Sequence, residues 1–213
     1  MKMQDVYQKL EEAALVPVLV IDQEDKAIPV CEALIKGGIR CVEITYRTAA
    51  ASKAMRLVRK NFPEILLGAG TVLNRGQIDD AVDAGADFIV SPGFVKENVV
   101  YGMKKGATMI PGCATPGEME QAMQLGVKVV KFFPAVSFGG VEALNLIGNV
   151  YGDLKFMPTG GINYSNMKEF LSCPYVIATG GIWMATRQMI NEGAYEEITE
   201  NANLAVTRKS EIR

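Results

Sequence analysis

Short apolar runs alternate with longer amphipathic stretches along almost the whole chain. The runs are rich in valine, isoleucine, leucine and phenylalanine, which is typical of buried strands. Between them, apolar residues recur with a helical period and glycine commonly follows, which predicts a helix in each connection. Thr115, Pro116 and Glu118 have the spacing of a capping box at one such helix start. The eight predicted strands cover residues 16–21, 41–46, 66–71, 88–92, 108–112, 129–134, 155–159 and 176–179.

This order of elements predicts an α/β fold. Apolar strands that alternate with helices form a parallel sheet whose outer face the helices cover. Eight such strands favour a closed (β/α)8 TIM barrel, to which the amphipathic stretch 3–14 adds an extra N-terminal helix. An open sheet of six or seven strands is the alternative, and it requires that the first, fifth or eighth strand is absent. No break in composition marks a linker, so we expect residues 1–213 to form a single barrel domain.

Composition and charge narrow the class of protein. With 49% hydrophobic and 22% charged residues, the chain has the composition of a soluble globular protein with a sizeable core. A net charge of −2 and a pI near 5.4 give no electrostatic reason to expect nucleic acid or an anionic membrane as a partner. No apolar run approaches the roughly 18 residues of a membrane-spanning helix, and residues 1–10 lack the apolar core of a signal peptide. We therefore expect a cytoplasmic protein.

The chain contains no histidine, and its four cysteines are scattered without a CxxC pair. This pattern argues against a structural zinc site and a disulfide framework. Catalysis by Ser-His-Asp or Cys-His groups is excluded, so acid–base chemistry must fall to Glu, Asp, Lys or Tyr. We expect neither a metal ion nor a cofactor.

One cation lies in the middle of the sixth apolar run. Alternation along the strand places Val129, Lys131 and Phe133 on one face. Burial of an ammonium group costs several kcal/mol unless the lysine has a partner or a function. A lysine amine in apolar surroundings is a nucleophile toward carbonyls and forms Schiff bases. The alternatives are a lysine that reaches solvent from the strand end and a structural ion pair.

Three polar residues share one face of the second predicted strand: Glu43, Thr45 and Arg47. The outer face of a barrel strand must be apolar to meet the helices, so we expect these three side chains to point inward. They also lie toward the C-terminal end of the strand, where the chemistry of such barrels sits. Charged groups inside a barrel are costly to keep unless they are used. The alternative is a structural ion pair of Glu43 with Arg47 or with Lys131.

The third strand ends in the small residues Gly68-Ala69-Gly70-Thr71. Small residues let a ligand approach the backbone, and the Thr71 hydroxyl can bind an anion. A tight turn capped by Thr71 is the alternative. Ser91-Pro92-Gly93 is most simply a turn, in which Pro92 is at most a wall of a pocket.

The motif Thr-Gly-Gly-Ile occurs twice, at 159–162 and at 179–182, after the seventh and eighth predicted strands. Paired glycines expose backbone N–H groups, and a helix start behind them adds its positive end, so together they predict a phosphate site. A single copy would also suit a simple turn. With Lys131, Glu43 and Arg47, these loops predict a barrel enzyme that forms a Schiff base with a small oxo acid.

Five segments together form a recognisable pattern: VEITYRT at 42–48, GAGTVL at 68–73, SPG at 91–93, KFFPA at 131–135 and PTGG at 158–161. They resemble the 2-keto-3-deoxy-6-phosphogluconate (KDPG) aldolase family, also called 4-hydroxy-2-oxoglutarate (KHG) aldolase. The resemblance covers nearly the whole chain. It implies a class I aldolase of the Entner–Doudoroff type, a homotrimer, which cleaves KDPG to pyruvate and glyceraldehyde 3-phosphate and needs no cofactor.

The resemblance also implies roles for individual residues. It assigns the Schiff base to Lys131 and proton transfer through a bound water to Glu43. Arg47 and Thr71 correspond to the groups that hold the pyruvate carboxylate. The remaining matches are the pocket walls Pro92 and Phe133 and the segment for the distal hydroxyls and phosphate, Thr159, Gly160 and Gly161.

One position departs from the family pattern. Family members often carry Gly-Gly-Ser-Trp after the eighth strand, where the serine contributes to phosphate binding, whereas this chain has Ile182 between Gly181 and Trp183. Without the serine hydroxyl, a hydrogen bond to the phosphate is missing. The backbone N–H groups of Gly160, Gly161 and Gly181 remain, so we expect phosphate to be bound but less tightly. Thr159 favours the gluconate-type substrate over the galactonate type.

Two other functions remain open from the sequence. One is a phosphate-binding barrel isomerase or decarboxylase without a covalent intermediate. The other is a non-catalytic barrel that binds a phosphorylated metabolite. Covalent capture of pyruvate distinguishes both from the aldolase.

Overall fold

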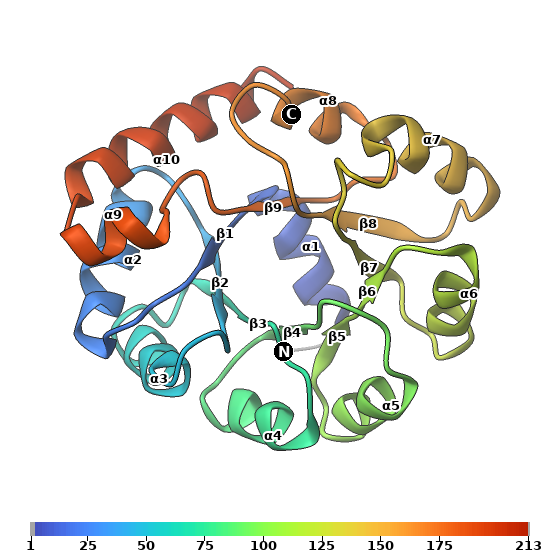
Figure 1. Cartoon of the computed structure of the whole chain (residues 1–213), viewed down its shortest axis with the longest axis horizontal. Helices are drawn as coiled ribbons and strands as arrows, with labels where there is room; N and C mark the ends of the chain where they lie inside the picture. Colours follow the sequence, from blue (N-terminus) through green and yellow to red (C-terminus); the bar gives the residue numbers. More distant parts are fainter. Residues whose placement is uncertain (1–2, 213) are drawn as a thin grey trace.

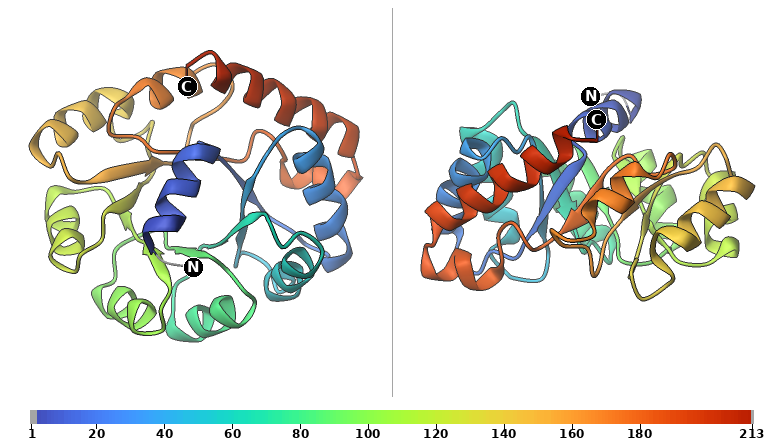
Figure 2. Two further views of the ribbon diagram at one scale, coloured as in Figure 1. Left: turned by 180° about the vertical axis from the view of Figure 1, so that it is seen from behind. Right: turned by 90° about the horizontal axis from the view of Figure 1, so that it is seen from above.

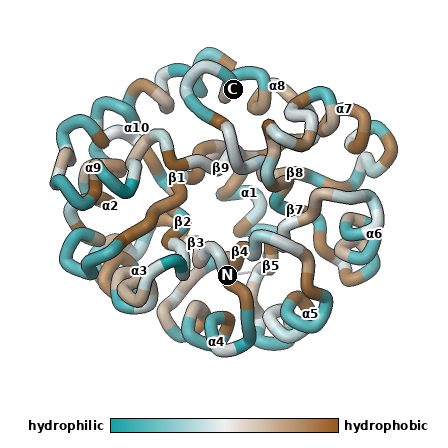
Figure 3. Tube along the Cα trace, in the orientation of Figure 1, coloured by the Kyte–Doolittle hydropathy of each residue, from teal (hydrophilic) through white to brown (hydrophobic). Residues whose placement is uncertain are grey.

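Parallel strands form a curled sheet ringed by helices in the computed structural model, which describes residues 3–212 (Figure 1). Hydrophobic segments follow the strands, and hydrophilic residues recur along the outer helices (Figure 3). The strands are β1 Leu15–Leu19, β2 Cys41–Thr45, β3 Leu66–Gly70, β4 Phe88–Val90, β5 Thr108–Ile110, β6 Gly112–Cys113, β7 Val129–Phe132, β8 Lys155–Pro158 and β9 Thr179–Gly181.

The sheet consists of two hydrogen-bonded sections. The first has the order β5-β4-β3-β2-β1-β9, and the second has the order β6-β7-β8. Only Pro111 separates β5 from β6, and its carbonyl accepts a hydrogen bond from the Lys131 N–H at 2.9 Å. Proline has no N–H to donate to a ladder, so the predicted strand 108–112 divides there. At the other seam, isolated bridges join Phe156 to Val176 and Thr159 to Gly180.

Helices fill the connections, as the sequence pattern predicts. The capping box at the start of α6 is present, with the Thr115 hydroxyl and the Glu118 carboxylate each accepting from the other residue's backbone N–H. No helix in residues 3–212 is long and apolar enough to cross a membrane. The helices are α1 Met3–Ala13, η1 Glu24–Lys26, α2 Ala27–Lys36, α3 Ala51–Asn61, α4 Arg75–Asp83, α5 Lys96–Lys104, α6 Pro116–Gln124, α7 Gly140–Val150, α8 Met167–Ser172, α9 Arg187–Glu192 and α10 Tyr195–Ser210.

Helix α1 covers the end of the sheet where the strands begin (Figure 2). Its buried residues Val6 and Leu10 pack against side chains at the strand starts, among them Val16, Leu66 and Val129. Burial of these apolar side chains stabilises the packing of α1 on this end of the sheet. The polar residues Glu43 and Lys131 lie further along their strands.

The last strand differs from the prediction. β9 covers Thr179–Gly181 and pairs with β1, with Val16 opposite Gly180, whereas Val176 forms only an isolated bridge. The predicted strand 176–179 thus lies too early, and the glycine pair expected in a turn belongs to the strand. Glycine is required there because a Cβ on Gly180 would lie 2.5 Å from Thr159 Oγ1.

The helix starts expected behind the glycine pairs are also displaced. α8 begins at Met167 and α9 at Arg187, each several residues after its glycines. Both are short helices. Backbone N–H groups without an adjoining helix dipole can bind an anion at the half-buried Gly160 and the exposed Gly161, whereas Gly180 and Gly181 are buried in β9.

Asp22, which follows β1, binds the start of α9. Arg187 donates Nε to Oδ2 at 2.8 Å and Nη2 to Oδ1 at 2.7 Å, and Asn191 Nδ2 donates at 2.8 Å. The hydrogen bonds from Arg187 and Asn191 lower the pKa of Asp22 from 3.8 to about 2. Because its folded-state pKa is the lower one, these bonds stabilise the fold above pH 4, and their contribution is lost as the pH falls toward 2.

We expect Asp22→Asn to lower the free energy of unfolding at pH 6 and to leave it unchanged near pH 2. Solvent screening of this exposed pair limits the loss at pH 6 to below about 1 kcal/mol. Urea unfolding at the two pH values measures it. Glu24→Gln, which removes the single exposed pair of Glu24 with Lys53, is the control with a smaller expected effect. An equal loss at both pH values would contradict the prediction.

Candidate active site

Lys131 and Glu43 meet inside the sheet. Lys131 Nζ lies 3.7 Å from Glu43 Oε1, and the two residues are only 4% and 0% exposed. Neither carboxylate oxygen of Glu43 has a hydrogen-bond donor among the protein groups described. A buried carboxylate without donors is costly, so this geometry suits a group that exchanges protons with a ligand. The predicted inward positions of both side chains are confirmed.

Two glycines lie beside this pair where no side chain would fit. A Cβ on Gly70 would lie 2.1 Å from Glu43 Oε1, so only glycine at the end of β3 lets the carboxylate adopt its position. Gly112, opposite Lys131 in the sheet, lies against the backbone of Pro92, where a Cβ would come within 2.2 Å of the carbonyl oxygen. The half-buried Pro92 therefore lies beside the strand that flanks Lys131.

The other two polar residues of the second strand behave differently. Thr45 is buried, and its hydroxyl donates to the Leu19 carbonyl at 2.9 Å, so it links β2 to β1. Arg47 is not buried inside the sheet, where we expected it. β2 ends at Thr45, and Arg47 lies in the turn that follows, with an exposed side chain. The alternation of a strand does not extend into a turn, which explains the error.

Thr71 has an unusual backbone conformation. It directly follows β3, with a φ of 55°, and its side chain is partly exposed. A β-branched residue rarely adopts positive φ, and such strain commonly lies at functional sites. This residue directly follows Gly70, the glycine that lies against the Glu43 carboxylate.

Phe133 and the first glycine pair border the lysine. Lys131 Nζ lies 5.4 Å from the centre of the half-buried Phe133 ring. Gly160 has a φ of 97°, and a Cβ there would lie 3.2 Å from the same ring. Its neighbour Gly161 also has positive φ, at 79°. Glycine suits both positions because L side chains rarely adopt this conformation.

Thr159 and Ile182 lie near the place where isolated bridges join the two sections of the sheet. Thr159 is 7% exposed, and its hydroxyl has no hydrogen-bond partner within residues 3–212. Ile182 follows β9 and is 53% exposed, which places an apolar side chain at the surface. Gly181 lies in β9, where the Trp183 ring occupies the place of a side chain. Exposed apolar and buried unpaired polar groups both mark positions where a ligand or partner can bind.

A hydrogen-bonded aspartate was missed by the sequence analysis. Asp80 on α4 accepts a hydrogen bond from the Tyr46 hydroxyl at 2.6 Å, just behind the turn that carries Arg47. Tyr46 directly follows β2 and is half-buried. A half-buried phenol needs a partner, and this is the signal that could have indicated one.

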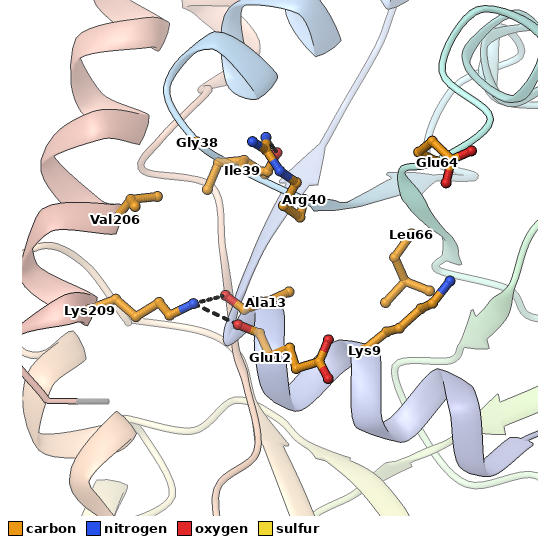
Figure 4. Close-up of a pocket in the computed structure, with 10 residues that line it drawn as sticks. All are labelled: Lys9, Glu12, Ala13, Gly38, Ile39, Arg40, Glu64, Leu66, Val206 and Lys209. Atoms are coloured by element: carbon orange, nitrogen blue, oxygen red, sulfur yellow. Dashed lines mark hydrogen bonds between the residues drawn. The ribbon is translucent and has the colours of Figure 1, made fainter.

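A separate pocket of about 330 Å³ lies at the other end of the sheet (Figure 4). Lys9, Arg40 and Lys209 line it together with Glu12 and Glu64. Lys209 Nζ donates to the carbonyl oxygens of Glu12 at 2.6 Å and Ala13 at 3.3 Å, tying α10 to α1. These side chains surround the strand starts, the end of the sheet that α1 covers.

Comparison with known proteins shows the family of this chain. The family model for KDPG and KHG aldolase matches residues 6–201. The chain is 41% identical to a 2-dehydro-3-deoxy-phosphogluconate aldolase of Treponema pallidum, over 91% of this chain and 92% of the relative. It is 38% identical to the KHG/KDPG aldolase of Escherichia coli strain K12, over 90% of each.

Solved structures of such enzymes have the same fold. A KDPG aldolase from Legionella pneumophila, with pyruvate captured as a covalent carbinolamine, is 38% identical and superposes with a TM-score of 0.91 over 96% of this chain and 98% of that one. The enzyme of Zymomonas mobilis ZM4 with 3-phosphoglycerate is 35% identical, with a TM-score of 0.87 over 95% of each chain. The chain therefore belongs to the KDPG and KHG aldolase family and is a lyase.

Proposed function

We propose that this chain cleaves KDPG to pyruvate and glyceraldehyde 3-phosphate through a Schiff base on Lys131, with KHG as a further substrate. The buried Lys131–Glu43 pair carries the proposal. It places an amine 3.7 Å from a carboxylate that accepts no hydrogen bond from the described residues. The covalent pyruvate of the Legionella relative supports the same chemistry and disfavours an isomerase, a decarboxylase or a non-catalytic barrel. Borohydride reduction in the presence of pyruvate tests it.

The reaction follows from these two groups. The Lys131 amine adds to the C2 carbonyl, and the carbinolamine loses water to give an iminium ion. The C4 hydroxyl then gives up its proton through a bound water to Glu43 while the C3–C4 bond breaks, and the bond electrons pass into the iminium as an enamine. Glyceraldehyde 3-phosphate leaves. Protonation at C3 and addition of water release pyruvate and restore the amine.

Arg47 and Thr71 hold the substrate carboxylate in this proposal. The Arg47 guanidinium is exposed and forms no hydrogen bond or ion pair with the part of the chain described, so its donors are available. A guanidinium binds a carboxylate through two parallel hydrogen bonds. Thr71, whose backbone has positive φ, follows β3, the strand paired with β2, and supplies a hydroxyl there. Pro92 and Phe133 form apolar walls beside Lys131.

The phosphate end of the substrate is assigned to the two Thr-Gly-Gly segments. Thr159 supplies a hydroxyl without an internal partner, and Gly160 and Gly161 supply backbone N–H groups in a turn of positive φ. Gly181 is a weaker candidate donor, since it belongs to a strand paired with β1. Ile182 lies beside it with no polar atom to offer.

Ile182→Ser is expected to raise the preference for KDPG over KHG, in kcat/KM, by about tenfold or more, because a hydrogen bond to a charged group is worth roughly 1.5–3 kcal/mol. The two substrates differ in charge at the distal end, so their ratio reports on phosphate binding. Leu146→Ser, at an exposed leucine on α7, is the matched control and should leave the ratio unchanged. A ratio that does not rise would show that residue 182 does not face the phosphate.

The closed (β/α)8 TIM barrel with an extra N-terminal helix is part of the same proposal. β5 and β6 count as one strand interrupted at Pro111, and the Thr159–Gly180 bridge supports closure of the ring. We further propose that residues 1–213 form one domain and that the protein works as a cytoplasmic homotrimer. Exposed apolar side chains such as Leu73, Phe138 and Val150 support contacts between copies.

A further inference from the structure

Three side chains donate hydrogen bonds to one carboxylate behind the proposed carboxylate site. Asp80 accepts from the Tyr46 hydroxyl at 2.6 Å, from the Ser52 hydroxyl at 2.7 Å and from Arg56 Nη2 at 3.1 Å. Arg56 Nη1 also donates to the Asp83 carbonyl at 2.9 Å. Asp80 lies on α4, Ser52 and Arg56 lie on α3, and Tyr46 is the residue that directly follows β2. The carboxylate thus joins three elements.

The network is partly sheltered from solvent. Burial alone would raise the pKa of Asp80, but the hydrogen bonds from Tyr46, Ser52 and Arg56 outweigh it and lower the pKa below 3.8. Burial, followed by the bond to Asp80, raises the pKa of the Tyr46 hydroxyl far above 10. At neutral pH the phenol is therefore the donor and the carboxylate the acceptor. Hydrogen bonds to a charged group are among the stronger ones in proteins.

Both sequence neighbours of Arg47, Tyr46 and Thr48, are held by hydrogen bonds. On one side, Tyr46 is held by Asp80 and by its backbone N–H, which donates to the Gly70 carbonyl at 2.8 Å. On the other side, the Thr48 hydroxyl donates to the Ile21 carbonyl. The Arg47 guanidinium itself has no partner within the described chain. Its position therefore depends on the backbone that these neighbours fix.

Asp80 also lies on the helix that follows Thr71, the second residue proposed to bind the substrate carboxylate. Thr71 leads from β3 toward α4, the helix that carries Asp80. Asp80 therefore connects the turn that carries Arg47 with the helix that follows Thr71. Precise placement of charged binding groups depends on such supporting contacts.

We propose that Asp80 is a positioning residue that acts through Tyr46 to hold Arg47 in place for the substrate carboxylate. This inference rests on the proposed function, in which Arg47 binds that carboxylate. Asp80 touches neither the substrate nor the reacting atoms. Loss of the Tyr46–Asp80 bond should weaken substrate binding and leave the chemical step at Lys131 unchanged.

Tyr46→Phe is the direct test. We expect KM for KDPG to rise about three- to tenfold, the range of one typical intramolecular hydrogen bond, with kcat changed by less than about twofold. Repeating the substitution in an Arg47→Ala background forms a double-mutant cycle. If Tyr46 acts through Arg47, Tyr46→Phe should change KM by less than about twofold in that background, because no guanidinium remains to be positioned.

Tyr101→Phe is a matched control, because the Tyr101 hydroxyl on α5 also donates to an aspartate of α4. The Tyr101 hydroxyl donates to both oxygens of Asp79, at 2.9 and 2.8 Å, but it anchors α5 and not the turn of Arg47. It should leave KM and kcat unchanged, whatever its effect on the melting temperature. If Tyr46→Phe does not fold, Asp80→Asn, which keeps an acceptor oxygen but loses the charge, should raise KM in the same direction.

Two results would overturn the inference. One is an equal rise in KM for Tyr46→Phe with and without Arg47, and the other is a change in melting temperature alone. An Arg47→Ala variant with normal KM would show that Arg47 does not bind the substrate carboxylate, and the inference would then fail. Pyruvate trapping on Lys131 in the unsubstituted protein tests the proposed function separately, because it does not depend on how Tyr46 acts.

Discussion

Borohydride is expected to attach pyruvate to Lys131 and to abolish aldolase activity. Lys131 is almost fully buried in β7, with Glu43 Oε1 3.7 Å from its amine, so it combines a shielded nucleophile with a neighbouring proton acceptor. Lys128 and Lys155 lie near the strand starts, away from this end of the sheet. Lys155 Nζ already donates to the Pro174 carbonyl at 3.1 Å. Neither has a carboxylate within ion-pair distance in residues 3–212.

Peptide mapping by mass spectrometry locates the adduct. Lys131→Arg keeps the positive charge but lacks the amine that forms an imine, so it should neither trap pyruvate nor cleave KDPG. Lys155→Arg is the control from the adjacent strand, and it should retain both properties. An adduct on another lysine, or inactivation without an adduct, would disprove the Schiff base on Lys131.

Most of the fold could be predicted because buried strands and amphipathic helices leave clear hydrophobic periods. The prediction failed where local chemistry competes with that pattern. Pro111 interrupts an apolar run because it lacks an N–H group. Thr179-Gly180-Gly181 looks like a turn, yet it forms β9 because β1 offers a pairing edge and Thr159 leaves no room for a side chain. Only tertiary contacts decide such cases.

The centre of the candidate site was predictable for a similar reason. Strand alternation alone places Lys131 and Glu43 on inward faces, and burial of both charges is unusual enough to indicate function. Alternation misplaced Arg47 because nothing in the sequence shows that β2 ends two residues earlier. The contact of Tyr46 with Asp80 joins residues 34 positions apart on a strand end and a helix, and no local spacing encodes it.

Glu43→Gln is expected to slow turnover by about 10²–10⁴-fold, the loss typical of removing a general acid–base group. The amide has nearly the same shape as the carboxylate but cannot accept the proton of the C4 hydroxyl. The site should still bind pyruvate, because Lys131 keeps its amine and Gly70 leaves room for the glutamine side chain at position 43. We therefore expect borohydride to trap pyruvate on Lys131 in this variant. Turnover of KDPG and mass spectrometry of the reduced protein measure the two properties separately.

Thr45→Val provides the matched control for loss of a buried polar group. Thr45 lies two residues along the same face of β2, and its hydroxyl bonds only to the Leu19 carbonyl among the contacts that the structure describes. Its replacement should lower the free energy of unfolding by about 1 kcal/mol and leave turnover largely intact. A rate loss in Glu43→Gln that merely equals the loss in Thr45→Val would mean that Glu43 supports the fold and transfers no proton. Slow turnover together with intact trapping assigns Glu43 to the proton transfer that follows Schiff-base formation.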